Sequence, residues 1–238
     1  AGAGSPSRAN DLNPPKQETA SDQGEVEGNR QPLPEMPEVD RSAYETVQTM
    51  ERLEHWIARA TAARLVAVDT ETSALDAMQA ELVGVSLALG PNDACYIPLA
   101  HGGADMFAEK LEQVERDAAI AALKPLLESD AVLKIGQNIK YDWLVLAGCG
   151  IALGGVFFDT MLASYLLDPG KRAHNLDRIA LDFLGHQTIS YEDVAGKGKK
   201  AVSFDQILVE KAVPYACEDA DSTLMARDIL APRLQDAG

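Results

Sequence analysis

Two acidic residues, Asp69 and Glu71, follow the apolar run Leu65–Val68. The run is partly β-branched, which is typical of a buried strand, and side chains alternate between the two faces of a strand. The two carboxylates therefore leave the same face close together, where they repel each other unless a divalent cation lies between them. Taken alone, such a pair is more often two solvated acids in a turn, so the interpretation depends on further acids.

Two other pairs of residues have the spacing of one helix face. Asn138 and Asp142 lie four residues apart in a segment expected to be helical, and so do Tyr215 and Asp219. Either pair alone is ordinary surface decoration. Together with the first pair, however, they provide four carboxylates from three elements, with no compensating cluster of His or Cys. Such a set suits two hard divalent ions, Mg²⁺ or Mn²⁺. Ions about 3.5–4 Å apart would clamp the attacking and leaving oxygens in phosphodiester hydrolysis.

Hydrophobic periodicity indicates the elements that must hold these residues. Three early strands are joined by short turns, and later strands alternate with helices, so we expect an α/β domain with a mixed five-stranded sheet and helices on both sides. The expected strands cover residues 65–68, 82–89, 94–99, 132–136 and 156–158. The expected helices cover residues 42–63, 105–128, 138–147, 159–167, 174–185 and 205–231, with a loop over 189–201.

The domain organisation is expected to be a disordered linker over residues 1–42 followed by one domain over residues 43–238. The linker is rich in small and polar residues and nearly lacks large apolar ones, so it cannot bury enough surface to offset the entropy of ordering. The chain also begins without Met, which fits a segment of a longer protein.

Composition limits the kind of partner. The net charge of −16 argues against sequence-independent gripping of a long duplex, which needs a basic surface. A short single-stranded end could still enter a pocket whose cations supply the positive charge. The three cysteines are scattered, which is typical of reduced thiols and predicts a cytoplasmic protein. No apolar run approaches the roughly 18–20 residues that span a bilayer, so no membrane partner is expected.

Longer motifs carry a resemblance to a known family. The chain resembles the 3′→5′ proofreading exonuclease domain of bacterial family A DNA polymerases, the DNA polymerase I group. That domain belongs to the DEDD exonucleases of ribonuclease H-like fold, in the subclass with a tyrosine in the third motif. The resemblance runs from about residue 45 to the end, and its segments are 69–72, 96–98, 134–142, 158–165, 195–199 and 215–221.

The resemblance implies a role for each candidate catalytic residue. Asp69, Glu71 and Asp219 would hold the first cation, and Asp69 would bridge to the second. Asp142 would hold the second cation, largely through water. Tyr215 would orient the attacking water. The implied cofactors are two divalent cations, Mg²⁺, with Mn²⁺ or Zn²⁺ as alternatives.

The resemblance also implies a seat for the terminal nucleotides. Leu75 would wedge between the last two bases and Tyr191 would stack on a base, with ordinary packing as the alternative for both. The basic run Gly196–Lys200 could contact phosphates or could be a solvated loop. The residues expected to bind substrate are Thr72, Leu75, Gln137, Asn138, Tyr141 and Tyr191.

The expected activity is hydrolysis of the terminal phosphodiester at single-stranded or frayed DNA 3′ ends, releasing nucleoside 5′-monophosphates in DNA replication and repair. The expected partners are a C-terminal polymerase domain and an N-terminal 5′-nuclease domain in a longer parent chain, which would be monomeric. Two alternatives stay open. An exoribonuclease would use the same chemistry and differ in accepting the 2′-OH, and a non-catalytic module would bind single strands or support a polymerase.

Overall fold

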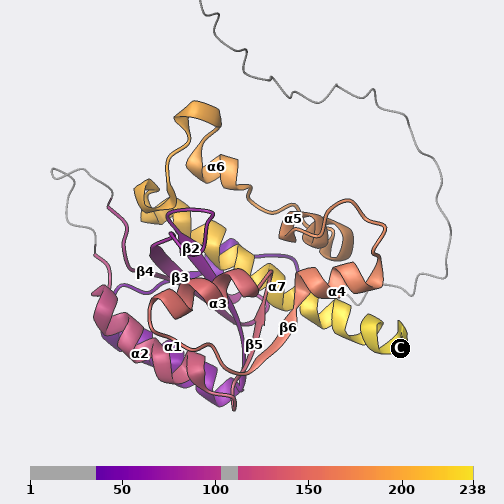
Figure 1. Cartoon of the computed structure of the whole chain (residues 1–238), viewed down its shortest axis with the longest axis horizontal. Helices are drawn as coiled ribbons and strands as arrows, with labels where there is room; N and C mark the ends of the chain where they lie inside the picture. The colour runs from indigo at the N-terminus through magenta and orange to yellow at the C-terminus, as the bar shows by residue number, and fades with distance from the viewer. Residues whose placement is uncertain (1–35, 103–111, 238) are drawn as a thin grey trace, which may run out of the picture. The chain divides into compact units, whose positions relative to one another are not determined.

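The computed structural model describes residues 36–102 and 112–237, and a mixed six-stranded sheet forms its centre (Figure 1). The spatial order of the strands is β1-β4-β3-β2-β5-β6. Strands β2, β3 and β4 pair antiparallel, whereas β1, β5 and β6 are parallel to their neighbours β4, β2 and β5. The strands are β1 (Glu45–Thr46), β2 (Leu65–Thr72), β3 (Leu82–Gly90), β4 (Asp93–Pro98), β5 (Leu133–Gly136) and β6 (Val156–Asp159).

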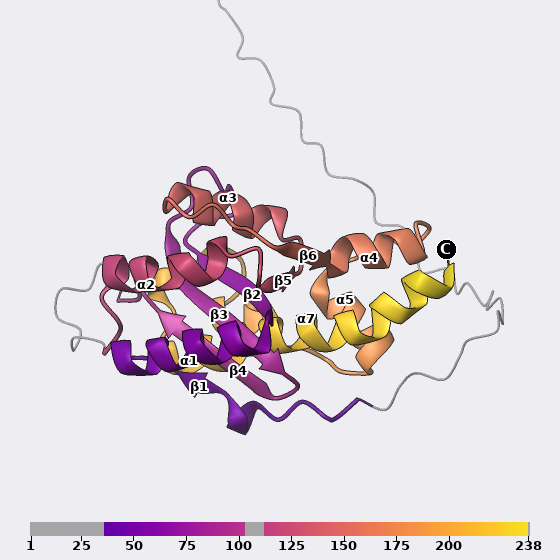
Figure 2. The same ribbon diagram turned by 90° about the horizontal axis from the view of Figure 1, so that it is seen from below.

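Helices cover both faces of the sheet. Side chains of α1, α2 and α3 form one core against it, and those of α7 form a second core against the other face. Helices α4 and α5 lie beside the C-terminal part of α7 (Figure 2). The helices are α1 (Met50–Ala63), α2 (Arg116–Glu128), α3 (Lys140–Gly148), α4 (Thr160–Leu167), α5 (Leu176–Ile179), α6 (Tyr191–Ala195) and α7 (Val209–Ala237).

Strand β2 shows how the sequence assigns side chains to the two faces. Val66 and Val68 are fully buried in the core that contains α1 and α2. Ala67, between them, is buried in the core that contains α7. Because the side-chain period of a strand is two residues, the odd-numbered positions that follow also face α7. The expected alternation therefore directs Asp69 and Glu71 toward the C-terminal helix.

The α/β class, the mixed sheet and the helices on both sides are confirmed, but the expected number of five strands is wrong. The additional strand β1 pairs parallel with β4 through Glu45 and Thr46, within a segment that we expected to be helical. Helix α1 instead begins at Met50, where the side chain of Thr49 accepts the backbone N–H of Arg52. The N-cap residue Thr49 sets the start of the helix. Residues 45 and 46 precede it and are therefore free to pair with β4.

Three other expectations concern element boundaries. The helix expected from residue 105 begins at Arg116, because the Glu115 side chain accepts the N–H groups of Asp117 and Ala118 as an N-cap; residues 103–111 lie outside the described residues. The expected loop 189–201 contains α6. Of the expected linker, residues 1–35 lie outside the described residues, and Arg41–Ala43 form one 3₁₀ turn. No helix in the described ranges combines the length and apolar character needed to cross a membrane.

Candidate active site

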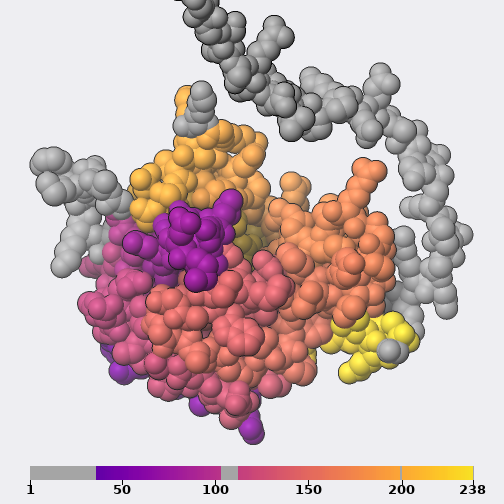
Figure 3. Space-filling model, viewed as in Figure 1, coloured from indigo at the N-terminus to yellow at the C-terminus, as the bar shows by residue number. Residues whose placement is uncertain are grey.

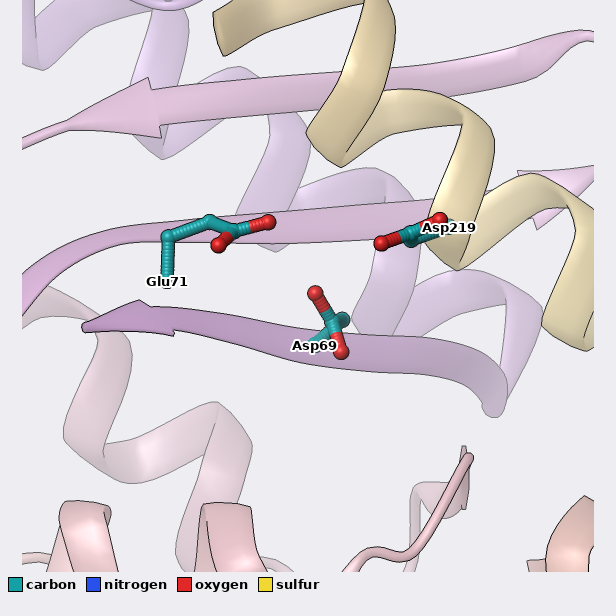
Figure 4. Close-up of side chains that lie close together, drawn as sticks. All are labelled: Asp69, Glu71 and Asp219. Carbon is teal, nitrogen blue, oxygen red and sulfur yellow. The ribbon is translucent and has the colours of Figure 1, made fainter. Parts of the chain in front are cut away.

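Three carboxylates converge between the sheet and its C-terminal helix. Asp69 and Glu71 project from β2 toward α7, and Asp219 projects from α7 toward β2 (Figure 4). One carboxylate oxygen from each residue lies within 4.8 Å of the other two. Two of these acids come from one strand and the third from a distant helix. The packing of α7 against β2 and β3 brings them together. The arrangement can present three oxygen ligands to one divalent cation.

The electrostatics of the three acids fit a cation. Burial raises the pKa of Asp69 to about 6. Burial, and then the charges of Asp69 and Asp219, raise the pKa of Glu71 well above its usual range. The pKa of Asp219 is also raised by burial and by Asp69, while the nearby Tyr215 hydroxyl opposes that shift.

Within residues 36–102 and 112–237, the ion pairs of Lys, Arg and His involve neither these three acids nor Asp142. Like charges held this close without a basic partner cannot all ionise cheaply. A hard divalent cation would offset the repulsion, since carboxylate oxygens are its preferred ligands. The donor set therefore fits the cation that the sequence predicts.

Asp142 reaches the same region from the other side of the strand. It lies in the first turn of α3 and is buried. Its Oδ1 accepts the backbone N–H of Thr70, at 3.0 Å, and the Thr70 hydroxyl, at 2.6 Å. Burial and the charge of Asp69 raise the pKa of Asp142. Asp142 is therefore close enough to Asp69 for their charges to interact. It is not one of the three residues whose oxygens lie within 4.8 Å of one another.

Tyr215 lies one turn before Asp219 on α7 and belongs to a small aromatic cluster. Its ring centroid is 6.0 Å from that of Phe204 and 6.4 Å from that of Tyr191. Tyr191 also stacks on Phe204 with a centroid separation of 6.5 Å. Burial and the charge of Asp219 raise the pKa of Tyr215 strongly, so its hydroxyl keeps its proton at neutral pH and can donate a hydrogen bond.

The loop after β2 carries the residue expected to act as a wedge. Leu75 is 98% exposed, so its side chain is not packed against the other described residues. The hydroxyl of Tyr141 donates to the carbonyl of Ala74 at 2.6 Å and is also hydrogen-bonded to the Thr72 hydroxyl. The Tyr141 hydroxyl is therefore engaged with this loop, while its ring is partly buried against the core that contains α1, α2 and α3.

Gln137 and Asn138 are held by residues of β6, α4 and the following loop. The side chain of Gln137 accepts the Thr160 hydroxyl and donates to the carbonyl of His174 at 2.8 Å. The backbone N–H of Asn138 donates to Asp159 at 3.2 Å. Asn138 has φ of 57°, a left-handed conformation that Asn adopts more readily than most residues. The turn between β5 and α3 is therefore anchored on Asp159.

The residues expected to seat the substrate contact partners in different parts of the fold. Tyr191 lies against the catalytic candidate Tyr215, and Thr72 is bonded to Tyr141, whereas Gln137 is held by the segment that leads into α5. In the view of Figure 3, the molecular surface is hollowed between the segment around α6 and the segment that contains α4 and α5. In the basic run Gly196–Lys200, the exposed Lys197 side chain lies 3.0 Å from Glu192 of α6.

Sequence reasoning did not assign a role to three residues that lie next to the candidate ligands in the sequence or contact one of them. Thr70 binds Asp142, and Glu218 and Asp221 are fully buried acids on α7. The only available signal was the density of acids around Asp219, which by itself does not distinguish a ligand from a buried anchor. Cys217 is fully buried, as expected for a core residue.

Comparisons with known proteins agree on one family. The model of the family described as "3′-5′ exonuclease" matches residues 44–235. DNA polymerase I of Pseudomonas aeruginosa is 46% identical over 218 residues, which cover 91% of this chain and 23% of that protein. The chain therefore spans less than a quarter of the length of this curated relative.

Solved structures share the fold at lower sequence identity. The EXO domain of Nibbler from Aedes aegypti superimposes with a TM-score of 0.60 at 15% identity, covering 86% of this chain and 94% of that domain. Brucella melitensis NrnC with bound Mg²⁺ superimposes with a TM-score of 0.56 at 21% identity, covering 82% of this chain and 81% of NrnC. The expected ribonuclease H-like fold is confirmed by these likenesses.

Proposed function

The chain belongs to the 3′→5′ exonuclease family of family A DNA polymerases, and from this membership we propose that it removes nucleotides from single-stranded or frayed DNA 3′ ends. The proposed reaction is hydrolysis of the terminal phosphodiester, with release of a nucleoside 5′-monophosphate. The observation that carries the proposal is the convergence of Asp69, Glu71 and Asp219 oxygens within 4.8 Å of one another, beside a protonated tyrosine.

The proposed cofactors are two divalent cations, Mg²⁺ or Mn²⁺. When bound, they lower the pKa of a water molecule and stabilise charge on the attacking and leaving oxygens. Asp69, Glu71 and Asp219 would hold one cation, and Asp69 with Asp142 would hold the other. The fit of the donor set to hard cations supports this assignment.

Tyr215 is proposed to orient the attacking water. Its hydroxyl lies next to the carboxylate of Asp219 and is kept protonated by burial, so it can donate a hydrogen bond at neutral pH. A donor held by the Phe204 and Tyr191 rings loses little freedom on binding substrate, and such pre-organisation lowers the barrier of the chemical step.

The seat of the terminal nucleotides is proposed to combine two apolar contacts. Leu75, which is fully exposed on its loop, would separate the last two bases. Tyr191 is 45% exposed beside Tyr215, so one side of it is free to stack on a base. Stacking tolerates any base, which suits an enzyme that must remove every mismatch. Thr72, Gln137, Asn138 and Tyr141 would complete the seat.

DNA is preferred over RNA as the proposed substrate because the relatives with high sequence identity are DNA polymerases. In such a relative, this segment would adjoin a polymerase domain on its C-terminal side and a 5′-nuclease domain on its N-terminal side. The polymerase would then deliver the frayed primer end.

A direct assay tests the proposal. A 5′-labelled single-stranded oligodeoxynucleotide is incubated with the chain and Mg²⁺, with EDTA, or with Mg²⁺ after the substitution Asp228→Asn, which removes a half-exposed acid elsewhere on α7. We expect stepwise shortening from the 3′ end with Mg²⁺ alone and with Asp228→Asn, and none with EDTA. A wild-type chain that is inert with both Mg²⁺ and Mn²⁺ contradicts the proposal. Faster degradation of an RNA of the same sequence would favour the exoribonuclease, and calorimetry without Mn²⁺ binding would favour the non-catalytic module.

A further inference from the structure

Glu218 is a fully buried carboxylate next to Asp219 on α7, and both of its oxygens are engaged. Oε1 accepts the Arg41 guanidinium through Nε at 2.8 Å and Nη2 at 2.6 Å, and it lies 2.7 Å from Nε2 of His186. Oε2 accepts the backbone N–H of Ile189 at 2.6 Å. Consecutive residues of a helix point about 100° apart, so Glu218 is directed away from the three-carboxylate cluster. It binds protein groups on two other segments instead.

The first segment is the N-terminal strap, which we define as residues Asp40–Thr46. The strap is fixed to the rest of the fold at several points besides Arg41. The Tyr44 hydroxyl donates to the buried Asp221 at 2.8 Å, and the N–H of Asp40 donates to the side chain of Asn92 at 2.7 Å. The strap therefore contacts α7 at acids on both sides of Asp219 in the sequence. Its Arg41 side chain is 40% exposed, whereas that of Glu218 is fully buried.

The second segment begins α6. Ile189 lies two residues before Tyr191, and the intervening Ser190 is the N-cap of the helix, where Ser190 and Asp193 form a reciprocal capping box. Ser190 donates its hydroxyl to Asp193 at 2.6 Å. The bond from Ile189 to Glu218 thus fixes the chain directly before a rigid helical turn. Since Tyr191 is the first residue of that turn, the position of its ring depends on the bond.

These contacts form a continuous path from the strap to the catalytic candidates. Arg41 holds Glu218, Glu218 holds Ile189, and the helix that follows presents Tyr191 against the ring of Tyr215 at 6.4 Å. Because a buried carboxylate is costly without partners, Glu218 adopts the position that keeps Arg41, His186 and Ile189 bonded. A change at Arg41 therefore alters the balance of contacts that holds the start of α6.

We propose that Glu218 and Arg41 are positioning residues, which set the orientation of Tyr191 and so the seat of the substrate strand. The inference rests on the proposed function, because it assigns to Tyr191 the stacking role given above. It goes beyond the family match, which begins at residue 44. The unit required for full activity on a nucleic acid strand therefore includes the strap from Asp40 onward.

Two substrates distinguish strand positioning from an effect on the cation site. One is a single-stranded oligodeoxynucleotide, and the other is the p-nitrophenyl ester of thymidine 5′-monophosphate, which has no second base to be seated. With Arg41→Ala we expect kcat/KM for the oligonucleotide to fall roughly tenfold, as for a misplaced positioning contact, while that for the ester falls less than about twofold. Arg41→Lys should recover part of the loss. Assays are made well below the melting temperature of every variant.

Arg52→Ala is the matched control, because Arg52 pairs with Glu45 of the strap itself, at 2.7 Å. It therefore removes one strap contact without breaking the bond between Arg41 and Glu218. It should leave both rates unchanged. Glu218→Gln tests whether Arg41 acts through Glu218. When Arg41→Ala is added to Glu218→Gln, kcat/KM for the oligonucleotide should fall little further, because the effects of two residues in direct contact are not additive. Equal loss on both substrates, or full activity of Arg41→Ala on the oligonucleotide, overturns the proposal.

Hydrogen–deuterium exchange gives a readout that does not need nuclease activity. Peptides covering residues 187–195 should exchange faster in Arg41→Ala and at the wild-type rate in Arg52→Ala, because the Ile189 N–H is bonded to Glu218. Unchanged exchange in Arg41→Ala overturns the positioning path even if the wild-type chain is an active exonuclease. A wild-type chain without activity on either substrate, but with faster exchange in Arg41→Ala, would instead refute the proposed function and leave the path intact.

Discussion

Asp142 accepts two hydrogen bonds from Thr70, one from its backbone N–H at 3.0 Å and one from its hydroxyl at 2.6 Å. Thr70 lies between Asp69 and Glu71 on β2, and its side chain points to the opposite face of the sheet. The fourth acid is therefore tied to the strand that carries the first two. This link sets the position of Asp142 relative to Asp69 although the two are far apart in the sequence.

Thr70→Val should weaken the contribution of Asp142 without removing any carboxylate. Valine keeps the β-branched shape of threonine but cannot donate to Asp142, so one of two bonds to a buried acceptor is lost, at a cost of about 1–3 kcal/mol. We expect kcat to fall about tenfold, with a higher Mn²⁺ concentration needed for half-maximal rate. Thr61→Val, at an exposed position of α1 where the hydroxyl donates to the carbonyl of Ile57, is the control and should leave the rate unchanged. If Thr70→Val needs the same Mn²⁺ concentration for half-maximal rate as the wild type, the hydrogen bond from Thr70 does not position Asp142 for cation binding.

Asp69→Asn and Asp219→Asn should each abolish measurable hydrolysis. Each change removes a negative ligand while keeping the shape of the side chain, and several kcal/mol of charge stabilisation correspond to about a thousandfold in rate. The measurement is single-turnover hydrolysis of the labelled oligonucleotide at saturating Mg²⁺. Asp228→Asn on the same helix serves as the matched control. Residual activity within tenfold of wild type in either variant would remove that acid from the reaction.

The metal-free protein should lose stability as the pH rises. Burial raises the pKa of Asp69 from 3.8 to about 6, and the pKa of Glu71 and of Asp219 is raised as well. A carboxyl whose pKa is higher in the folded than in the unfolded state stabilises the fold below the unfolded value, and that contribution is lost as the pH rises through the folded value.

In EDTA we therefore expect the melting temperature of the wild type to fall from pH 5 to pH 8 by about 5 °C more than that of Asp69→Asn. Saturating Mg²⁺ at pH 8 should restore much of the difference in the wild type and little in the variant. Parallel pH profiles of the two proteins in EDTA would show that Asp69 carries no raised pKa.

Cation binding should release protons near neutral pH. Because part of the carboxyl cluster is protonated in the absence of metal, and ligands must be deprotonated to bind, the affinity for Mn²⁺ should rise between pH 6 and pH 8. Calorimetric titrations in two buffers of different ionisation enthalpy give the number of protons released. We expect a positive number at pH 6 that approaches zero at higher pH. An affinity that is independent of pH would be inconsistent with the raised pKa values of these acids.

Leu75→Ala should affect the substrate and not the fold. Leu75 is 98% exposed, so its truncation removes no buried contact, and the melting temperature should change by less than about 1 °C. If the side chain separates the last two bases, kcat/KM for the oligonucleotide should fall about tenfold, since stacking contacts are worth about 1–3 kcal/mol. Leu166→Ala, at a 69% exposed position of α4, is the control. Equal rates for the two variants would contradict the wedge.

Local patterns predicted much of this site because its residues lie in regular elements. The alternation of β2 was sufficient to direct Asp69 and Glu71 to one face, and the spacing of four residues was sufficient to align Tyr215 with Asp219. The same reasoning was wrong for β1, since the pairing of Glu45 and Thr46 with β4 depends on an edge about fifty residues away. A two-residue strand has no periodicity of its own to reveal it.

The sequence by itself determined the chemistry available to this protein, because residue types and their periodicity decide which donors share a face of a strand or helix. Only the tertiary structure decided which of those donors meet. It brought Asp219 to the two acids of β2, placed Asp142 behind Thr70, and buried Glu218 against Arg41, which is 177 residues away. The physical reason is that such contacts are fixed by the packing of α7 and α3 on the sheet, and two neighbouring acids, Glu218 and Asp219, acquire different partners simply because a helix turns between them.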